Sequence, residues 1–144
     1  MTEFSTFIIS VRPVWANAFF LDSNPKTVEL RKGSFGASLK AGDIIVIYST
    51  LPEGKVIGKV QLVKRQLLSI PELWYRSQYG ELAKVSRQQF DTYYANHQSA
   101  VALWVDTPEL FSSPFSLNQL RQSWGQSWQP PQQIQQLRSP LPSL

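Results

Sequence analysis

The sequence contains no cysteine and a single histidine, His97. The absence of cysteine excludes disulfide bonds, thiolate nucleophiles, thiolate-bound zinc and iron–sulfur clusters. A metal site that needs two histidines is excluded as well. Any chemistry must therefore use lysine, arginine, carboxylate or hydroxyl groups, and we predict no metal site and no cofactor.

Long apolar runs are also missing. No stretch of about 18 apolar residues occurs, so the sequence predicts no membrane-spanning helix and no membrane partner. The first ten residues, MTEFSTFIIS, carry an acid at Glu3 and lack a basic leader and a cleavage site. We read them as the first strand of a cytoplasmic protein, and a chain of 144 residues is most simply one domain.

The formal charge of +4 is unevenly distributed along the chain. Residues 1–65 carry nine Lys and Arg against five Asp and Glu, whereas residues 66–144 carry five of each. A basic surface in the N-terminal part would attract phosphate backbones. A small soluble protein of slightly high isoelectric point has the same excess, so charge alone leaves nucleic-acid binding open.

Stretches rich in β-branched and apolar residues, bounded by turn residues, predict five strands. These cover residues 4–11, 26–32, 44–48, 55–65 and 99–105. The run IIVIY at 44–48 predicts a strand that is buried on both faces.

Four helices are predicted between and after these strands. One covers residues 14–21, where Pro13 suits the first turn. Three others begin after Ser69, Ser86 and Ser116, each followed three residues later by Glu or Gln as in a capping box. Because most strands follow one another through short turns, we predict an α+β fold. Its core would be a small barrel of five or six mostly antiparallel or mixed strands, plugged by three or four short helices.

The chain becomes rich in Gln and Pro after Trp124, and such a segment forms little core of its own. We expect residues 1–128 to form the domain and residues 129–144 to be a tail that is partly wrapped on it. Trp124 and Trp128 would either anchor this tail or close a lid over a cleft.

Three segments resemble a known family when they are taken in order. They are SVRPVWANAFFLDSNPKTVELRK, AGDIIVIYSTLPEGKVIGKVQL and ELWYRSQYGELAKVSRQQFDTYY. Together they resemble the ASCH domain family of the PUA-like superfamily, from about Phe7 to Trp104, and in particular small single-domain members often labelled as predicted transcriptional regulators. The resemblance implies a PUA-like pseudo-barrel with a cleft beside the first helix.

The resemblance also implies several activities. Relatives in this superfamily bind RNA, some by holding a modified base in an aromatic-lined pocket, and a minority are ribonucleases or amidohydrolases of acetylated cytidine. The amidohydrolases use a lysine and, three positions later, a threonine nucleophile. Here Lys26 matches the lysine, but Glu29 occupies the nucleophile position, and a carboxylate does not replace an alkoxide in acyl transfer.

Lys26, Glu29 and Arg31 are the central candidate residues. If Val28 and Leu30 face the core, Glu29 and Arg31 share the opposite face, about 7 Å apart. In a cleft, Lys26 and Arg31 would meet phosphate or carbonyl oxygens, and Glu29 would accept from a base N–H or orient Arg31. On a solvated face, the group would be a local ion pair contributing at most about 1 kcal/mol. Together with the resemblance, the pattern favours the cleft.

Three further residues complete the predicted ligand-binding set. Arg12 closes the first strand and would add positive charge to the rim. Trp15 would stack on a base or pack its helix onto the sheet. Tyr48, at the end of the buried strand, would offer a ring and a hydroxyl to a ligand or pack in the core.

The leading functional hypothesis is therefore a module that binds RNA or a nucleotide in a basic, aromatic-lined cleft. Such a module would read a modified base or act in regulation. Single-stranded DNA and a nucleotide-like small molecule are the alternative partners. Two other classes stay open: a hydrolase of a modified nucleoside or of RNA, with Lys26 and Glu29 as the catalytic pair, and a sensor of a small ligand.

Overall fold

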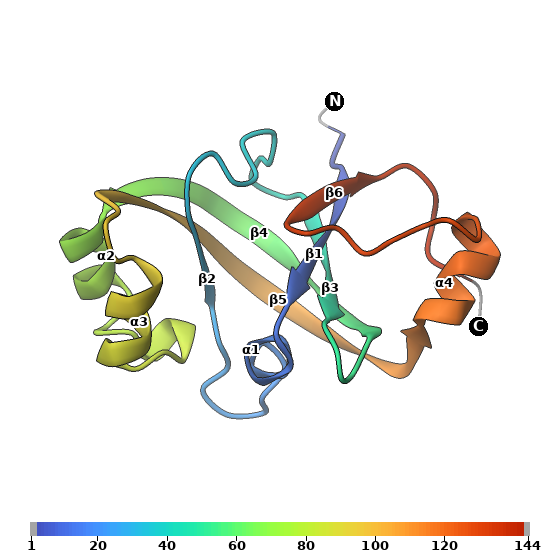
Figure 1. Ribbon diagram of the computed structural model, residues 1–144, viewed down its shortest axis with the longest axis horizontal. Helices are drawn as coiled ribbons and strands as arrows, with labels where there is room; N and C mark the ends of the chain where they lie inside the picture. Colours follow the sequence, from blue (N-terminus) through green and yellow to red (C-terminus); the bar gives the residue numbers. More distant parts are fainter. Residues whose placement is uncertain (1–2, 143–144) are drawn as a thin grey trace.

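The chain is built around one mixed β-sheet with helices at both ends of its long strands (Figure 1). The computed structural model describes residues 3–142. The strands are β1 (Thr6–Val11), β2 (Val28–Arg31), β3 (Ile44–Ser49), β4 (Lys55–Ser69), β5 (Ser99–Ser116) and β6 (Ile134–Leu137). The helices are α1 (Pro13–Ala18), α2 (Ile70–Arg76), α3 (Arg87–Tyr93) and α4 (Leu117–Trp124), with a short 3-10 helix, η1 (Glu81–Ala83), before α3.

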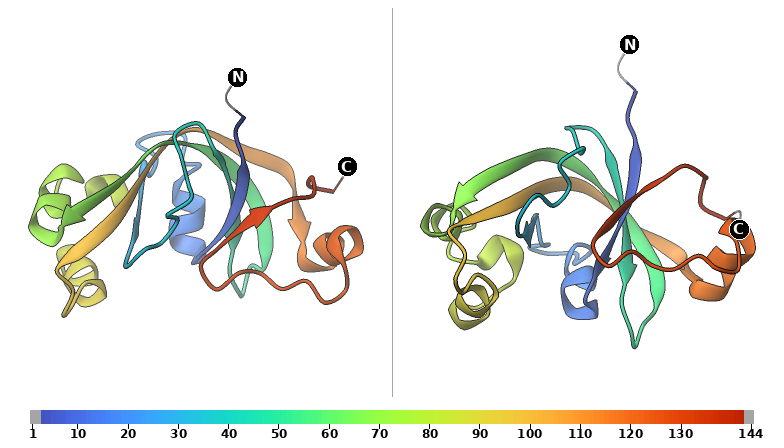
Figure 2. Two further views of the ribbon diagram at one scale, coloured as in Figure 1. Left: turned by 90° about the horizontal axis from the view of Figure 1, so that it is seen from above. Right: turned by 45° about the horizontal axis from the view of Figure 1, so that its top comes forward.

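The order of strands across the sheet is β2-β5-β4-β3-β1-β6. β1 and β3 run parallel, and the other neighbours run antiparallel. The register between β4 and β5 shifts at three places along their length. Such bulges increase the bend and twist of a strand, and the sheet curves around α1 (Figure 2).

The sheet does not close into a barrel. Within the described residues, β2 pairs with β5 alone and β6 pairs with β1 alone, so each leaves one edge open. The predicted α+β pseudo-barrel of five or six mostly antiparallel or mixed strands with three or four short helices is confirmed, with six strands and four α-helices among residues 3–142. The small barrel plugged by helices is not formed, because the sheet stays open.

Local sequence signals account for the helix ends. α1 begins at Pro13, where a missing N–H costs no hydrogen bond. Ser86 and Ser116 form complete capping boxes with Gln89 and Gln119, as predicted. The predicted box before α2 is half-formed, because Glu72 binds Arg76 on the next turn instead of the backbone of Ser69.

Three hydrophobic clusters fix the helices on the sheet. α1 packs on the middle of the sheet through Ala16 and Phe19. α2 and α3 pack on one end through Leu73 and Phe90, and α4 packs on the other end through Leu120 (Figure 2). β2 therefore lies between α1 and α3 (Figure 1). None of the helices in the described part of the chain is both long and apolar enough to cross a membrane.

The tail contributes to the sheet. Residues 134–137 pair antiparallel with residues 6–9 of β1. Neither β6 nor η1 was predicted from the sequence, and both β4 and β5 continue well beyond their predicted ends.

Candidate functional site

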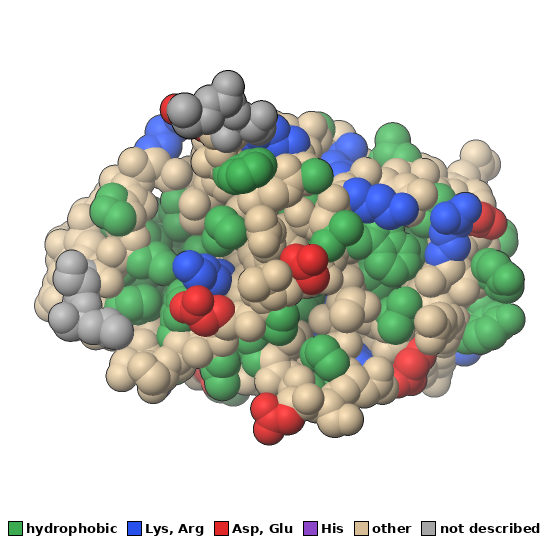
Figure 3. All heavy atoms as spheres, turned by 180° about the vertical axis from the view of Figure 1, so that it is seen from behind, with side chains coloured by type: hydrophobic (Ala, Val, Ile, Leu, Met, Phe, Trp, Pro, Cys, Tyr) green, Lys and Arg blue, Asp and Glu red, His purple; other side chains and the backbone are tan. Residues whose placement is uncertain are grey.

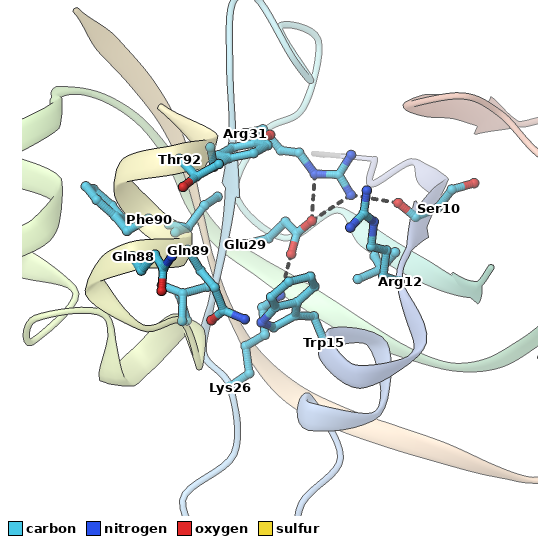
Figure 4. Close-up of a pocket in the computed structure, with 15 residues that line it drawn as sticks. Ser10, Arg12, Trp15, Lys26, Glu29, Arg31, Gln88, Gln89, Phe90 and Thr92 are labelled. Carbon is cyan, nitrogen blue, oxygen red and sulfur yellow. Dashed lines mark hydrogen bonds and ion pairs between the residues drawn. The ribbon is translucent and has the colours of Figure 1, made fainter. Parts of the chain in front are cut away.

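A cavity of about 640 Å³ lies between α1, β2 and α3 (Figure 4). Its wall is formed by residues 10–12 and Trp15, by Lys26 and residues 29–31, and by side chains of the segment from Ala83 to Tyr93. The volume falls within the range of small-molecule and cofactor sites, about 300–1,000 Å³. We call this cavity the β2 pocket.

A buried ion network forms the floor of the β2 pocket. Glu29 lies between two cationic groups: Lys26 Nζ is 2.5 Å from its Oε1, and Arg31 Nε donates to its Oε2 at 2.6 Å (Figure 4). Lys26 and Glu29 are each only 5% exposed. Because Lys26 and Glu29 are buried, they do not lie on a solvated strand face, which was the alternative that the sequence left open.

The surrounding chain holds each member of the network in place. The Lys26 ammonium lies over the Phe19 ring, 4.6 Å from its centroid, and the backbone N–H of Lys26 donates to Ala18 O. The Arg31 guanidinium lies over Phe35 at 4.5 Å and donates through Nη2 to Ser10 O at 2.8 Å. Arg31 thus connects β2 to β1, two strands that share no backbone ladder.

Burial and charge act against each other on the ionisable groups. Burial lowers the pKa of the Lys26 ammonium from its ordinary value, and the Glu29 carboxylate opposes this effect only in part. Burial alone would raise the pKa of Glu29, but the charges of Lys26 and Arg31 and their hydrogen bonds lower it overall. Glu29 is thus a carboxylate with both oxygens engaged.

Arg12 and Trp15 stand at the rim on the side of α1. The Arg12 side chain is exposed and has no hydrogen-bond or ion-pair partner among the described residues. The Trp15 indole N–H donates to Lys84 O at 2.8 Å, which fixes the half-buried ring in the wall of the pocket. With Lys26 and Arg31, Arg12 gives the lining three cationic side chains against one carboxylate, Glu29.

The opposite wall comes from α3 and was missed in the sequence. Gln88, Gln89, Thr92 and Tyr93 line the pocket from one side of this helix. Their spacing of 88 with 92 and 89 with 93 indicates a shared helix face. Nothing in the local sequence indicates that this face looks toward β2. Burial raises the pKa of the Tyr93 hydroxyl, and the Lys32 ammonium lies over its ring at 4.2 Å.

Tyr48 lies apart from the other predicted residues. It is 4% exposed and packs in a different cluster, with Ile8, Val46 and Leu120. Burial raises the pKa of its hydroxyl, against a smaller effect of Arg121. The structure therefore brings five of the six predicted ligand-binding residues to the β2 pocket, and Tyr48 does not line it.

Charge is also segregated elsewhere on the surface. On the face seen from behind, most Lys and Arg side chains lie in the upper part and most Asp and Glu side chains lie lower (Figure 3). The cationic excess of the chain is thus not confined to the pocket. Among residues 3–142, no three His, Cys, Asp or Glu side chains form a group that could hold a metal ion.

Fold and pocket together define a small α+β domain that encloses a positively charged cavity of ligand size. No family model matches the chain. It is 34% identical to the "ASCH domain-containing ribonuclease" of Zymomonas mobilis over 131 residues, which is 91% of this chain and 83% of that protein. The crystal structure of ASCH from Zymomonas mobilis superposes with a TM-score of 0.83 at 31% identity and covers 93% of this chain and 88% of that one. The chain belongs to the ASCH domain family.

A weaker similarity leads to a ribosomal protein. The chain is 24% identical over 122 residues to large ribosomal subunit protein uL22 of Ureaplasma parvum. The match covers 85% of this chain but 37% of that protein. It adds nothing to the family assignment.

Proposed function

We propose that the protein binds single-stranded RNA and that one nucleotide occupies the β2 pocket. The observation that carries the proposal is the composition of the lining: three cationic side chains surround a cavity of about 640 Å³ that has one carboxylate, which is already engaged. Such a site has a net attraction for phosphate.

The cationic groups have distinct roles in this proposal. Arg12 has no partner in the described chain and meets a phosphate at the rim. Arg31 has Nε and Nη2 engaged, and its Nη1 is left to donate to the ligand. Glu29 holds Lys26 and Arg31 in position, which is one of the two roles that the sequence predicted for it; with both oxygens occupied, it is not offered to a base.

The base of the nucleotide is placed against Trp15, with the amides of α3 at its edge. The Trp15 ring is fixed by its hydrogen bond to Lys84 O, so stacking would immobilise no further side chain. Stacking of a base on an aromatic ring contributes about 1–3 kcal/mol. Gln89 already uses Oε1 to accept from Ser86, which leaves its amide N–H groups for a base.

Single-stranded RNA is favoured over a duplex for a physical reason. A base enters a pocket of this kind only when it is unpaired and turned out of its stack. The choice of RNA over DNA is supported by the Zymomonas mobilis relative, which is named a ribonuclease.

Cleavage of RNA is the second candidate function, and the same relative favours it, because the two chains align over 91% of this one. The cations of the pocket would stabilise the charge of a phosphorane. Glu29 is a poor general base, since its pKa is lowered and both its oxygens accept hydrogen bonds. The geometry of the pocket therefore supports binding more directly than cleavage. Amide hydrolysis is not proposed, because the nucleophile position holds this same carboxylate.

The test uses a fluorescein-labelled single-stranded RNA of about 12 nucleotides, a length within the site sizes of single-strand-binding grooves. Fluorescence anisotropy is measured in EDTA, and gels follow the RNA over time with and without Mg²⁺. We expect binding that weakens as salt increases, and a loss of about tenfold in Arg12→Ala. Arg76→Ala, which removes an exposed arginine of α2, is the matched control.

The proposal fails if wild-type protein does not retain this RNA at low salt. Appearance of shorter products would support the second candidate, provided that Arg12→Ala slows their formation. If a nucleoside or nucleotide raises the melting temperature while RNA does not bind, the pocket is that of a small-ligand sensor.

A further inference from the structure

We infer a second RNA contact, on the surface formed by α4 and the C-terminal tail, where a base stacks on the Trp124–Trp128 pair and a phosphate meets Arg138. We call this the tail surface. It rests on the proposed function, because it assigns a further contact to the same RNA.

The tail surface contains a built aromatic site. A cavity of about 270 Å³ is lined by Trp124, Trp128, Gln135 and Arg138, among others. The two indole rings lie edge to face, with centroids 4.9 Å apart and planes at 69°. Trp124 Nε1 donates to Pro140 O at 2.9 Å and Trp128 Nε1 donates to Gln135 Oε1 at 3.2 Å. Both rings are therefore held by their N–H edges, and both residues are only partly buried, so part of each side chain stays exposed to a base.

The charge of this segment matches a polyanion. Residues 110–144 contain two arginines, Arg121 and Arg138, and no Asp or Glu. Arg121 is used internally, since its Nε donates to Trp128 O at 2.9 Å and ties α4 to the tail. Arg138 is exposed, and its one hydrogen bond is a long one of 3.5 Å to Gln136. An exposed cation beside fixed aromatic rings, with no acid nearby in sequence, is the combination that binds single strands.

The tail surface is connected to the β2 pocket through Ser10. This residue lines the pocket, and its carbonyl oxygen accepts from Arg31. Its hydroxyl donates to Pro131 O at 2.6 Å, and its backbone N–H donates to Gln133 O. The tail then continues from Gln133 into β6 and on to Arg138, alongside β1 (Figure 1). Ser10 therefore joins the wall of the β2 pocket to the segment that leads into the tail surface.

The length dependence of binding tests this inference. Affinities of a fluorescein-labelled dinucleotide and of an oligonucleotide of about 12 residues are compared in the same titrations. In wild-type protein the longer RNA binds more tightly, because it contacts both sites. We expect Trp128→Ala to weaken the longer RNA about tenfold and to leave the dinucleotide unchanged. Arg138→Ala should weaken the longer RNA and reduce the slope of log affinity against log salt by about 0.7.

Variants and controls separate the possible failures. Arg12→Ala should weaken binding of both RNAs. Arg76→Ala should weaken neither, because this residue ends α2, which lies at the end of the sheet opposite to α4 (Figure 1). Trp128 also packs against the core, so Trp128→Ala is used only if its melting temperature shows that it is folded. If it is not folded, Arg138→Ala, which removes an exposed side chain, is a sufficient test by itself. If wild-type protein binds the longer RNA and Arg138→Ala binds it equally well with the same salt slope, the tail surface is not a contact. If wild-type protein binds neither RNA, it is the proposed function that fails.

Discussion

Substitution of Glu29 by Gln changes one charge in the ion network and almost nothing in its shape. The side chains of Lys26, Glu29 and Arg31 are 4%, 6% and 14% exposed, so water screens them little. Without the carboxylate, two buried cations face each other with no counter-charge. Removal of one partner from a buried ion pair typically costs about 3–5 kcal/mol. Because the Gln oxygen still accepts one hydrogen bond, we expect a loss near the lower end, about 3 kcal/mol.

Urea unfolding at neutral pH measures this loss directly. Glu72→Gln is the control, since Glu72 pairs with Arg76 at the same distance of 2.6 Å but on an exposed surface, with side chains 44% and 48% exposed. Its cost should stay below about 1 kcal/mol. In the double variant Lys26→Met/Glu29→Gln, the loss should be smaller than in Glu29→Gln alone, because one unpaired cation is gone.

RNA binding of the same variant separates positioning from simple attraction. Glu29→Gln raises the net charge by one, so a protein that attracts RNA by charge alone would bind more tightly. If Glu29 positions Lys26 and Arg31, RNA binding weakens in the folded Glu29→Gln variant.

Equal losses in the free energy of unfolding for Glu29→Gln and Glu72→Gln would refute the predicted cost of about 3 kcal/mol. The ion network of Lys26, Glu29 and Arg31 would then behave as a solvated one.

Three further outcomes are expected. Because the pKa of Glu29 is lowered in the folded protein, its carboxylate contributes to the free energy of unfolding above the ordinary unfolded pKa of about 4.3. This contribution is lost as the pH falls toward the folded pKa. Acid unfolding followed by circular dichroism should therefore show a steeper loss of stability below about pH 4 in wild-type protein than in Glu29→Gln. Gly58→Ala would place a methyl group 2.5 Å from Glu109 O and 2.6 Å from the Phe20 ring, so urea unfolding should show a cost of about 1–3 kcal/mol, and an unchanged midpoint would contradict the close approach of β4 and β5. Tyr48→Phe removes a hydroxyl that has no hydrogen-bond partner among the described residues, so stability should change by less than about 0.5 kcal/mol; a loss of RNA binding in this stable variant would support the ligand contact that the sequence predicted for Tyr48.

Local signals in the sequence were sufficient for some elements. The capping boxes at Ser86 and Ser116 predicted where α3 and α4 begin, because a cap depends on residues within one turn. The apolar run from Ile44 to Tyr48 predicted a strand buried on both faces, and β3 is buried at every position after the first.

Elements that depend on distant partners were predicted less well. β5 continues to Ser116 although Pro108 and Pro114 interrupt its pattern. Thr107 and Pro108 fall at a register shift, where no backbone ladder is needed, so the strand passes a residue that cannot donate. β6 has a Gln-rich sequence without strand propensity and exists through its pairing with β1.

The candidate site divides in the same way. Strand alternation placed Glu29 and Arg31 on one face, with Lys26 at the start of the strand, and the family resemblance favoured a cleft over a solvated face. Their burial depends on α1, beside which the resemblance had placed a cleft, and on α3, which no signal in the sequence placed there. The side of α3 that faces these residues could be identified only from the structure. Tyr48 lies apart from them because successive residues of β3 point to opposite faces of the sheet.

The gap between β1 and β2 has a mechanical consequence. Where neighbouring strands share a ladder of amide bonds, a guest molecule cannot come between them without breaking that ladder. Here the two strands are joined by a guanidinium that reaches from Arg31 to Ser10 and still has one nitrogen to spare. In the proposed function, a ligand that accepts a hydrogen bond from this nitrogen would contact β1 and β2 at the same time, so the opening between the two strands would both admit the ligand and hold it.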